Sequence, residues 1–151
     1  MDQKTKIYFI ENSFDYNGNN LNSENIGGSE KTLINISNSF SRDDNFLIKV
    51  FNNTSDSQLI NNVYWGNINQ IDQSDEPDFL IAMSDANLFS YIKCKRNYLW
   101  SHSIQTIEKF LRKKQLIPFL KYKPILILEG EYHYNSRNFF TSFFGKKILK
   151  I

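Results

Sequence analysis

Short apolar runs, rich in β-branched and aromatic residues, alternate with segments of helical periodicity along nearly the whole chain. Strands that alternate with helices indicate βαβ units and a parallel sheet, in which the strands are buried on both faces. We expect an α/β fold with a doubly wound, Rossmann-like sheet of six to seven strands in the order 3-2-1-4-5-6, with the seventh at an edge, and helices on both faces. The expected strands cover residues 6–11, 46–51, 63–66, 79–84, 97–101, 125–129 and 147–151.

The helical segments between these strands have recognisable ends. Apolar residues recur at helical spacing from 29 to 40, and Ser29 is suited to cap the amino end of that helix. A long helical pattern begins near Ile104 and should break near Pro118, since proline interrupts a helix interior. A last helix should end at Gly145. Residues 55–62 fit either a short helix or a loop.

Composition excludes several classes of protein. With 151 residues the chain suits a single domain, 1–151, and its 40% hydrophobic content excludes a disordered chain. One cysteine, Cys94, excludes a disulfide scaffold, and two histidines with that cysteine cannot form a typical zinc site. The apolar runs are too short for a spanning helix or a signal peptide, so we expect a cytoplasmic protein.

Charge is distributed unevenly along the chain. Residues 1–90 carry 5 basic and 13 acidic side chains, a net −8, whereas residues 91–151 carry 13 basic and 3 acidic ones, a net +10. Between Lys109 and Lys123 basic and apolar residues interleave, as in helices that lie on anionic membranes. The alternative is a core-facing helix with a solvated basic side. No sequence signature of a nucleic-acid-binding domain accompanies the charge, so no nucleic-acid partner is expected.

Candidate site residues follow from the fold. In open parallel sheets, ligands bind beyond the carboxyl ends of the strands. The three loops that should meet there contain Gly27 and Gly28, Ser84 and Asp85, and Ser101 and His102. The two glycines could cradle a phosphate at a helix start or form an ordinary turn. His102 could bind a sugar hydroxyl or transfer a proton, or simply cap a strand end. Asp85 is a candidate for substrate binding but is most simply a helix N-cap.

Four segments together resemble a known family. They are GGSEKTLINIS after the first strand, YLWSHS at the fifth, LEGEYHYNSRNFF after the sixth, and the terminal KILKI. Their order is similar to that in the N-terminal half of retaining nucleotide-sugar glycosyltransferases of the GT-B fold. The resemblance implies that Gly27 and Gly28 approach a donor diphosphate, that Glu30 matches the acid of the Gly-Gly-x-Glu motif, and that His102 faces the donor sugar and the acceptor. Gly130 departs from the pattern, since the family often has serine there.

The resemblance implies a function as well as a fold. The chain would be the acceptor-side domain of a hexosyltransferase that transfers sugar with retention, using a nucleotide sugar as substrate and no cofactor or metal. Its partners would be that donor, a sugar or lipid-linked acceptor, and a C-terminal donor-binding domain outside residues 1–151. The segment from Lys109 to Lys123, by its own pattern, adds contact with the inner face of a membrane. Alone, the chain would be inactive. Two alternatives remain: a non-catalytic α/β binding module, and part of a nucleotide-sugar epimerase.

Overall fold

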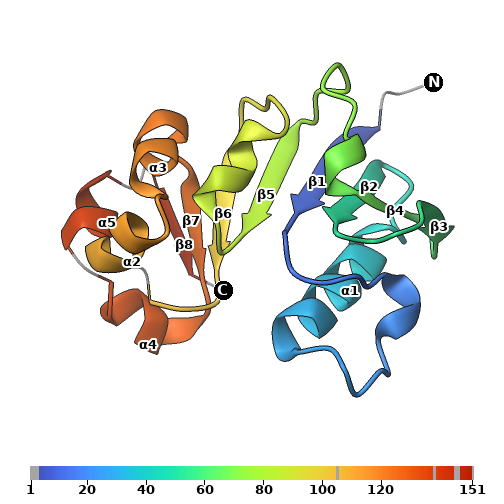
Figure 1. Ribbon diagram of the computed structural model, residues 1–151, viewed down its shortest axis with the longest axis horizontal. Coiled ribbons are helices and arrows are strands. Elements are labelled where there is room, and N and C mark those ends of the chain that lie inside the picture. The colour runs from blue at the N-terminus through green and yellow to red at the C-terminus, as the bar shows by residue number, and fades with distance from the viewer. Residues whose placement is uncertain (1–3, 105, 138, 145–146, 151) are drawn as a thin grey trace.

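Eight strands form one sheet in the order β3-β4-β2-β1-β5-β6-β7-β8 (Figure 1). The computed structural model describes residues 4–104, 106–137, 139–144 and 147–150. The strands are β1 (Thr5–Ile10), β2 (Phe46–Asn52), β3 (Gln58–Ile60), β4 (Val63–Asn67), β5 (Phe79–Met83), β6 (Asn97–Ser101), β7 (Ile125–Leu128) and β8 (Lys147–Lys150). All neighbouring pairs are parallel except β3 with β4, which is antiparallel.

The α/β class and the order of the parallel strands agree with the prediction, with β8 at the edge. The difference is β3, which lies in the segment expected to be a helix or a loop. Asn61 and Asn62 both have left-handed backbone angles, with φ of 52° and 61°, so the chain turns back and pairs Ile60 with Val63. Asparagine tolerates this conformation better than most residues, and a pair of such residues matches the twist of a hairpin.

Within the described residues, five α-helices and three short 3₁₀ helices connect the strands. They are α1 (Gly28–Phe40), α2 (Ile107–Arg112), α3 (Leu116–Tyr122), α4 (Gly130–Asn135), α5 (Phe139–Phe144), η1 (Gly18–Asn20), η2 (Ile68–Gln70) and η3 (Ala86–Ser90). None of the helices in the described ranges has the length and hydrophobicity needed to cross a bilayer.

Two expectations about helix ends were wrong. Gly27, not Ser29, is the N-cap of α1, so the helix begins at Gly28. The long pattern after residue 104 does not break at Pro118, which lies in the first turn of α3, where a missing N–H costs no hydrogen bond. The break comes earlier, at Lys114, whose φ is 54°. The end expected at Gly145 lies outside the described residues.

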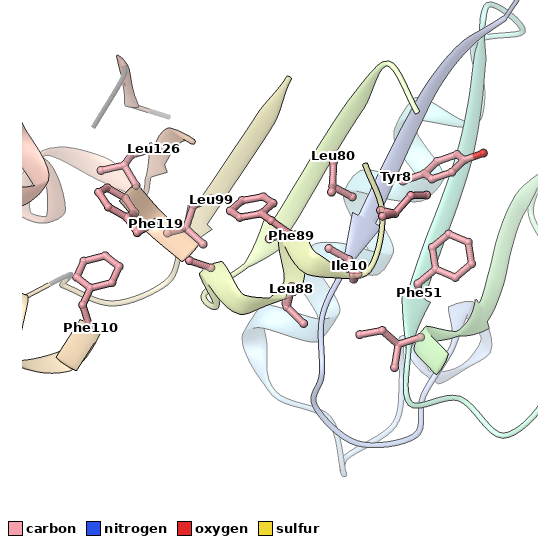
Figure 2. Packing of buried hydrophobic residues seen from close by; sticks show 14 of the residues in the cluster. Tyr8, Ile10, Phe51, Leu80, Leu88, Phe89, Leu99, Phe110, Phe119 and Leu126 are labelled. Atoms are coloured by element: carbon pink, nitrogen blue, oxygen red, sulfur yellow. The ribbon is translucent and has the colours of Figure 1, made fainter. Parts of the chain in front are cut away.

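Apolar side chains form a separate core on each face of the sheet. On one face, Leu33 and Ile34 of α1 pack with Phe9 and other strand residues. On the other, η3, α2 and α3 cover the strands, and Figure 2 shows Phe89, Phe110 and Phe119 beside the apolar residues of β1, β5, β6 and β7. Helices therefore lie on both faces, as predicted.

Cover on the α1 face is incomplete, contrary to the expectation that all strands are buried on both faces. An apolar hollow of about 210 Å³ lies beside α1, and Phe40, Ile81 and Ile127 are among the residues that line it. Ile81 of β5 and Ile127 of β7 are only half-buried. The connection of the strands explains the gap. Because α1 joins β1 to β2, it covers the part of this face near those two strands and leaves the part near β5 and β7 open.

The loop between η2 and β5 is fastened to the sheet by charge. The carboxylate of Asp75 accepts hydrogen bonds from Lys6 at 2.7 Å and from Lys49 and the hydroxyl of Tyr8. Burial alone would raise the pKa of Asp75, but the hydrogen bonds from Lys49, Lys6 and Tyr8 outweigh it and hold that pKa well below its usual range. The ionised carboxylate therefore stabilises the folded chain.

We expect Asp75→Asn to lower the free energy of unfolding by about 1–2 kcal/mol at neutral pH, since hydrogen bonds to charged groups are lost at a partly solvated site. Because folding lowers the pKa of Asp75, its contribution is complete above the unfolded pKa of about 4 and is lost as pH falls below it. Urea unfolding between neutral and acidic pH should show the two curves converging. The exposed Asp56→Asn is the control, and an equal loss there would refute the assignment.

Candidate functional site

A pocket of about 200 Å³ opens at the carboxyl edge of the sheet, where the loops that follow β1, β5 and β6 meet. It lies beyond the ends of β1, β5 and β6 and beside the start of α1. The polar side chains that line it include those of Glu11, Tyr16, Ser29, Glu30, Ser84 and His102. Three predicted site residues, Glu30, Ser84 and His102, therefore share one pocket.

His102 is held by groups from two other strand ends. Its Nδ1 lies 2.6 Å from Oε1 of Glu129, the residue that follows β7. The backbone N–H of His102 donates to Oγ of Ser84 at 3.4 Å, and its ring lies 5.1 Å from that of Trp100. The other ring nitrogen, Nε2, is buried and has no hydrogen-bond partner among the described residues. If Nδ1 carries the proton toward Glu129, Nε2 keeps a lone pair that can accept a hydrogen bond.

Glu11 brings a second titratable group into the pocket. It follows β1 and is 7% exposed, and its carboxylate accepts hydrogen bonds from the backbone and the hydroxyl of Ser13. Burial raises the pKa of Glu11, and the neighbouring Glu30 adds to the rise. Burial likewise raises the pKa of Tyr16, helped by Glu11. The wall of the pocket near β1 thus combines a carboxyl group and a phenol, both able to bind hydroxyl groups.

The turn after β5 adopts an uncommon backbone conformation. Ser84 has φ of 57°, a left-handed angle that is unfavourable for a residue with a Cβ atom. Gln115, fully buried at the turn between α2 and α3, supports this segment. Its Nε2 lies 3.5 Å from the carbonyl oxygen of Ser84, and its Oε1 accepts from the backbone N–H of Ala86 at 3.3 Å. The amide thereby fixes Ser84 beside His102.

The predicted glycines lie at the start of α1, next to the pocket. Gly27 is the N-cap and Gly28 the first helical residue, and the following two residues line the pocket. A Cβ atom on Gly27 would come within 2.7 Å of Oε2 of Glu30, while space around Gly28 is open. The Glu30 carboxylate thus lies over Gly27, at the positive end of the helix dipole. A diphosphate at this place would require the Glu30 side chain to turn away.

Asp85 and Ser101 lie near the pocket but make structural contacts. Oδ1 of Asp85 accepts from the backbone N–H of Asn87 at 2.9 Å, so Asp85 is the N-cap of η3, which was its simplest interpretation from sequence. Ser101 is fully buried and donates from Oγ to the carbonyl oxygen of Ser103. Both residues shape the loops that carry Ser84 and His102.

Sequence reasoning missed four residues of this site: Glu11, Tyr16, Glu129 and Gln115. Glu11 and Glu129 each follow a strand directly, and an acid at that position was a usable signal. Gln115 had no local signal, because only the packing of α2 and α3 against the sheet brings it to Ser84.

The charge of the pocket restricts the kinds of ligand that it can bind. The described residues that line it include two carboxylates and no lysine or arginine. Across the described part of the chain, no group of three or more His, Cys, Asp and Glu side chains could hold a metal ion. The pocket is therefore suited to neutral, hydroxyl-rich groups more than to an isolated anion.

No protein-family model, curated protein or solved structure matches this chain.

Proposed function

We propose that this chain is the acceptor-side domain of a glycosyltransferase that uses a nucleotide sugar, the N-terminal half of a GT-B enzyme. The observation that supports it is the convergence of Glu11, Glu30 and His102 in one pocket at the carboxyl edge, with Glu129 behind the histidine. Carboxylates and a neutral imidazole nitrogen accept hydrogen bonds from sugar hydroxyls. The proposal includes retention at the transferred sugar, which rests on the family resemblance.

The two faces of the pocket have different roles in this proposal. His102 lines the pocket, and its Nε2 accepts a hydrogen bond from a hydroxyl of the acceptor or of the transferred sugar once a small side-chain movement uncovers that buried atom. Glu129 is a positioning residue, because it orients the ring and favours the tautomer with the proton on Nδ1. Glu11 and Glu30 bind further hydroxyls from the side of β1 and α1. The donor diphosphate would lie closer to the open space around Gly28.

The proposal predicts that the chain binds sugars at this pocket. Chemical shifts of backbone amides, recorded during titration with methyl glycosides of glucose, mannose and galactose, should change for Glu11, Glu30 and His102. His102→Ala and Glu11→Gln should each weaken binding by about 10- to 100-fold, the effect of losing a hydrogen bond to a charged or polar buried group. Glu129→Gln should have a smaller effect, since it acts through His102.

Matched controls separate binding from folding. Glu24→Gln replaces an exposed acid away from the pocket and should leave binding unchanged. Thermal unfolding of every variant shows whether the fold is retained. If none of the three glycosides shifts the pocket amides, or if Glu24→Gln weakens binding as much as Glu11→Gln, the sugar site is refuted. Shifts confined to residues elsewhere would favour a binding module of another kind.

A further inference from the structure

Helices α2 and α3 expose an unusual set of aliphatic side chains. Ile107, Leu111, Ile117 and Leu120 are 47%, 58%, 77% and 37% exposed. The rest of the pair is well packed, since Phe110 and Phe119 meet at a ring distance of 4.8 Å and are fully buried (Figure 2). The two helices are therefore packed against the core through other side chains, and the four aliphatic residues are exposed on their outer side.

Exposed cations alternate with these aliphatic residues along the two helices and the turn between them. Arg112, Lys113, Lys114 and Lys121 are all exposed. Lys113 and Lys114 occupy the tight turn between the two helices, where the left-handed angle of Lys114 breaks the helical pattern. Lys109 does not belong to this surface, because it donates to Oγ of Ser103 and burial lowers its pKa. Glu108 is the one acid between residues 107 and 123.

We infer that this α2–α3 surface, made of the four aliphatic and four cationic side chains, docks on an anionic lipid bilayer. Aliphatic side chains gain free energy when they enter the boundary between headgroups and acyl chains, and lysines beside them are attracted to anionic headgroups. The charge is complementary to such a surface, since the segment lies within residues 91–151, which carry a net +10. The charged ends of the lysine and arginine side chains need not enter the apolar layer, because long side chains can keep their charge in water.

The composition of the surface favours lipid over a protein partner. Lysine is depleted from protein–protein interfaces, whereas three of the four cations here are lysines. Helix α2 is also linked to the candidate site, because Lys109 donates to Ser103 in the loop that carries His102. Docking would bring that loop close to the membrane, where an acceptor with a lipid anchor would be found.

Flotation of the 151-residue chain with vesicles tests this inference. The chain should float with phosphatidylcholine vesicles that contain about 30% phosphatidylglycerol and not with pure phosphatidylcholine, and high salt should release it. Lys113→Gln with Lys114→Gln should weaken binding by about 25-fold, or about fivefold per lysine. Ile117→Asp should weaken it by about tenfold or more, and Leu111→Asp provides a second test of the aliphatic contribution.

Two control variants match these changes in chemistry and exposure. Leu59→Asp alters a leucine that is 73% exposed on β3, and Lys93→Gln with Lys95→Gln removes two exposed lysines elsewhere. Both should bind vesicles like the unchanged chain, and all variants should unfold at similar temperatures. The inference is overturned if the chain does not float with anionic vesicles, or if the control variants lose as much binding as the variants of the α2–α3 surface. It is also overturned if the chain self-associates without lipid and Ile117→Asp abolishes that association, because the surface would then be a protein interface.

Discussion

Replacing Phe119 with alanine should lower the free energy of unfolding by about 3–5 kcal/mol, the usual cost of deleting a fully buried phenylalanine. Phe119 is 0% exposed and joins α3 to the core on its face of the sheet, beside Phe110 (Figure 2). The cavity cannot close easily, because η3 and the strands hold the surrounding side chains in place. The melting temperature should fall by roughly 10 °C for a chain of this size.

An exposed phenylalanine gives the matched comparison. Phe143 on α5 is 69% exposed, so Phe143→Ala should change the free energy of unfolding by less than about 1 kcal/mol. Guanidinium unfolding of the two variants measures the difference. Equal losses would mean that α3 contributes little to the core and would contradict the packing described for Phe119.

Gln115→Leu should lower the free energy of unfolding by about 2–3 kcal/mol, although leucine fills nearly the same volume. The substitution removes both hydrogen bonds of the buried amide and leaves the Ala86 N–H and the Ser84 carbonyl without them. An unsatisfied buried polar group costs about 1–3 kcal/mol. The left-handed turn at Ser84 would then lose its support, and amide chemical shifts at Ser84 and His102 should change.

Gln73→Leu is the control for this substitution, because Gln73 is exposed in the loop before β5. It should alter neither the unfolding free energy by more than about 0.5 kcal/mol nor the shifts at His102. A Gln115→Leu chain that is as stable as the unchanged one would show that the amide is dispensable. Loss of stability with unchanged shifts at Ser84 would show that Gln115 supports the core and not the turn.

The strands that could be predicted from sequence are those buried in the sheet. Runs such as FLIAM in β5 carry apolar residues on successive positions, which is typical of parallel strands buried on both faces. β3 could not be predicted this way, since it is three residues long and Leu59 is exposed. Its signal was the turn, where two asparagines adopt left-handed angles. The position where a helix breaks was harder to predict. Pro118 is tolerated in the first turn of α3, and the helical pattern breaks at Lys114 instead.

The candidate site shows a similar division. Sequence order alone was enough to place His102 and Ser84 at one edge, because the carboxyl ends of parallel strands meet there, whereas Glu30 was named from the family resemblance. Pairing between groups from different strands was not predictable. The contact between His102 and Glu129 depends on the register of β6 with β7, which aligns Ser101 with Leu128. The position of the Glu30 side chain over Gly27 likewise depends on a rotamer that no pattern encodes.

The hairpin of β3 and β4 also bears on how the chain folds. Its strands are joined by Asn61 and Asn62 alone, so the loop that must close is among the shortest possible. The parallel pairs close much longer loops, such as the one that separates Ile7 from Phe79. The entropy lost on closure rises with loop length, and hairpins form within microseconds while long-range pairing is slow. The hairpin can therefore form first, and β2 can then pair with β4. The sheet would grow from β3 and β4, in the acidic residues 1–90, toward β7 and β8, in the basic residues 91–151.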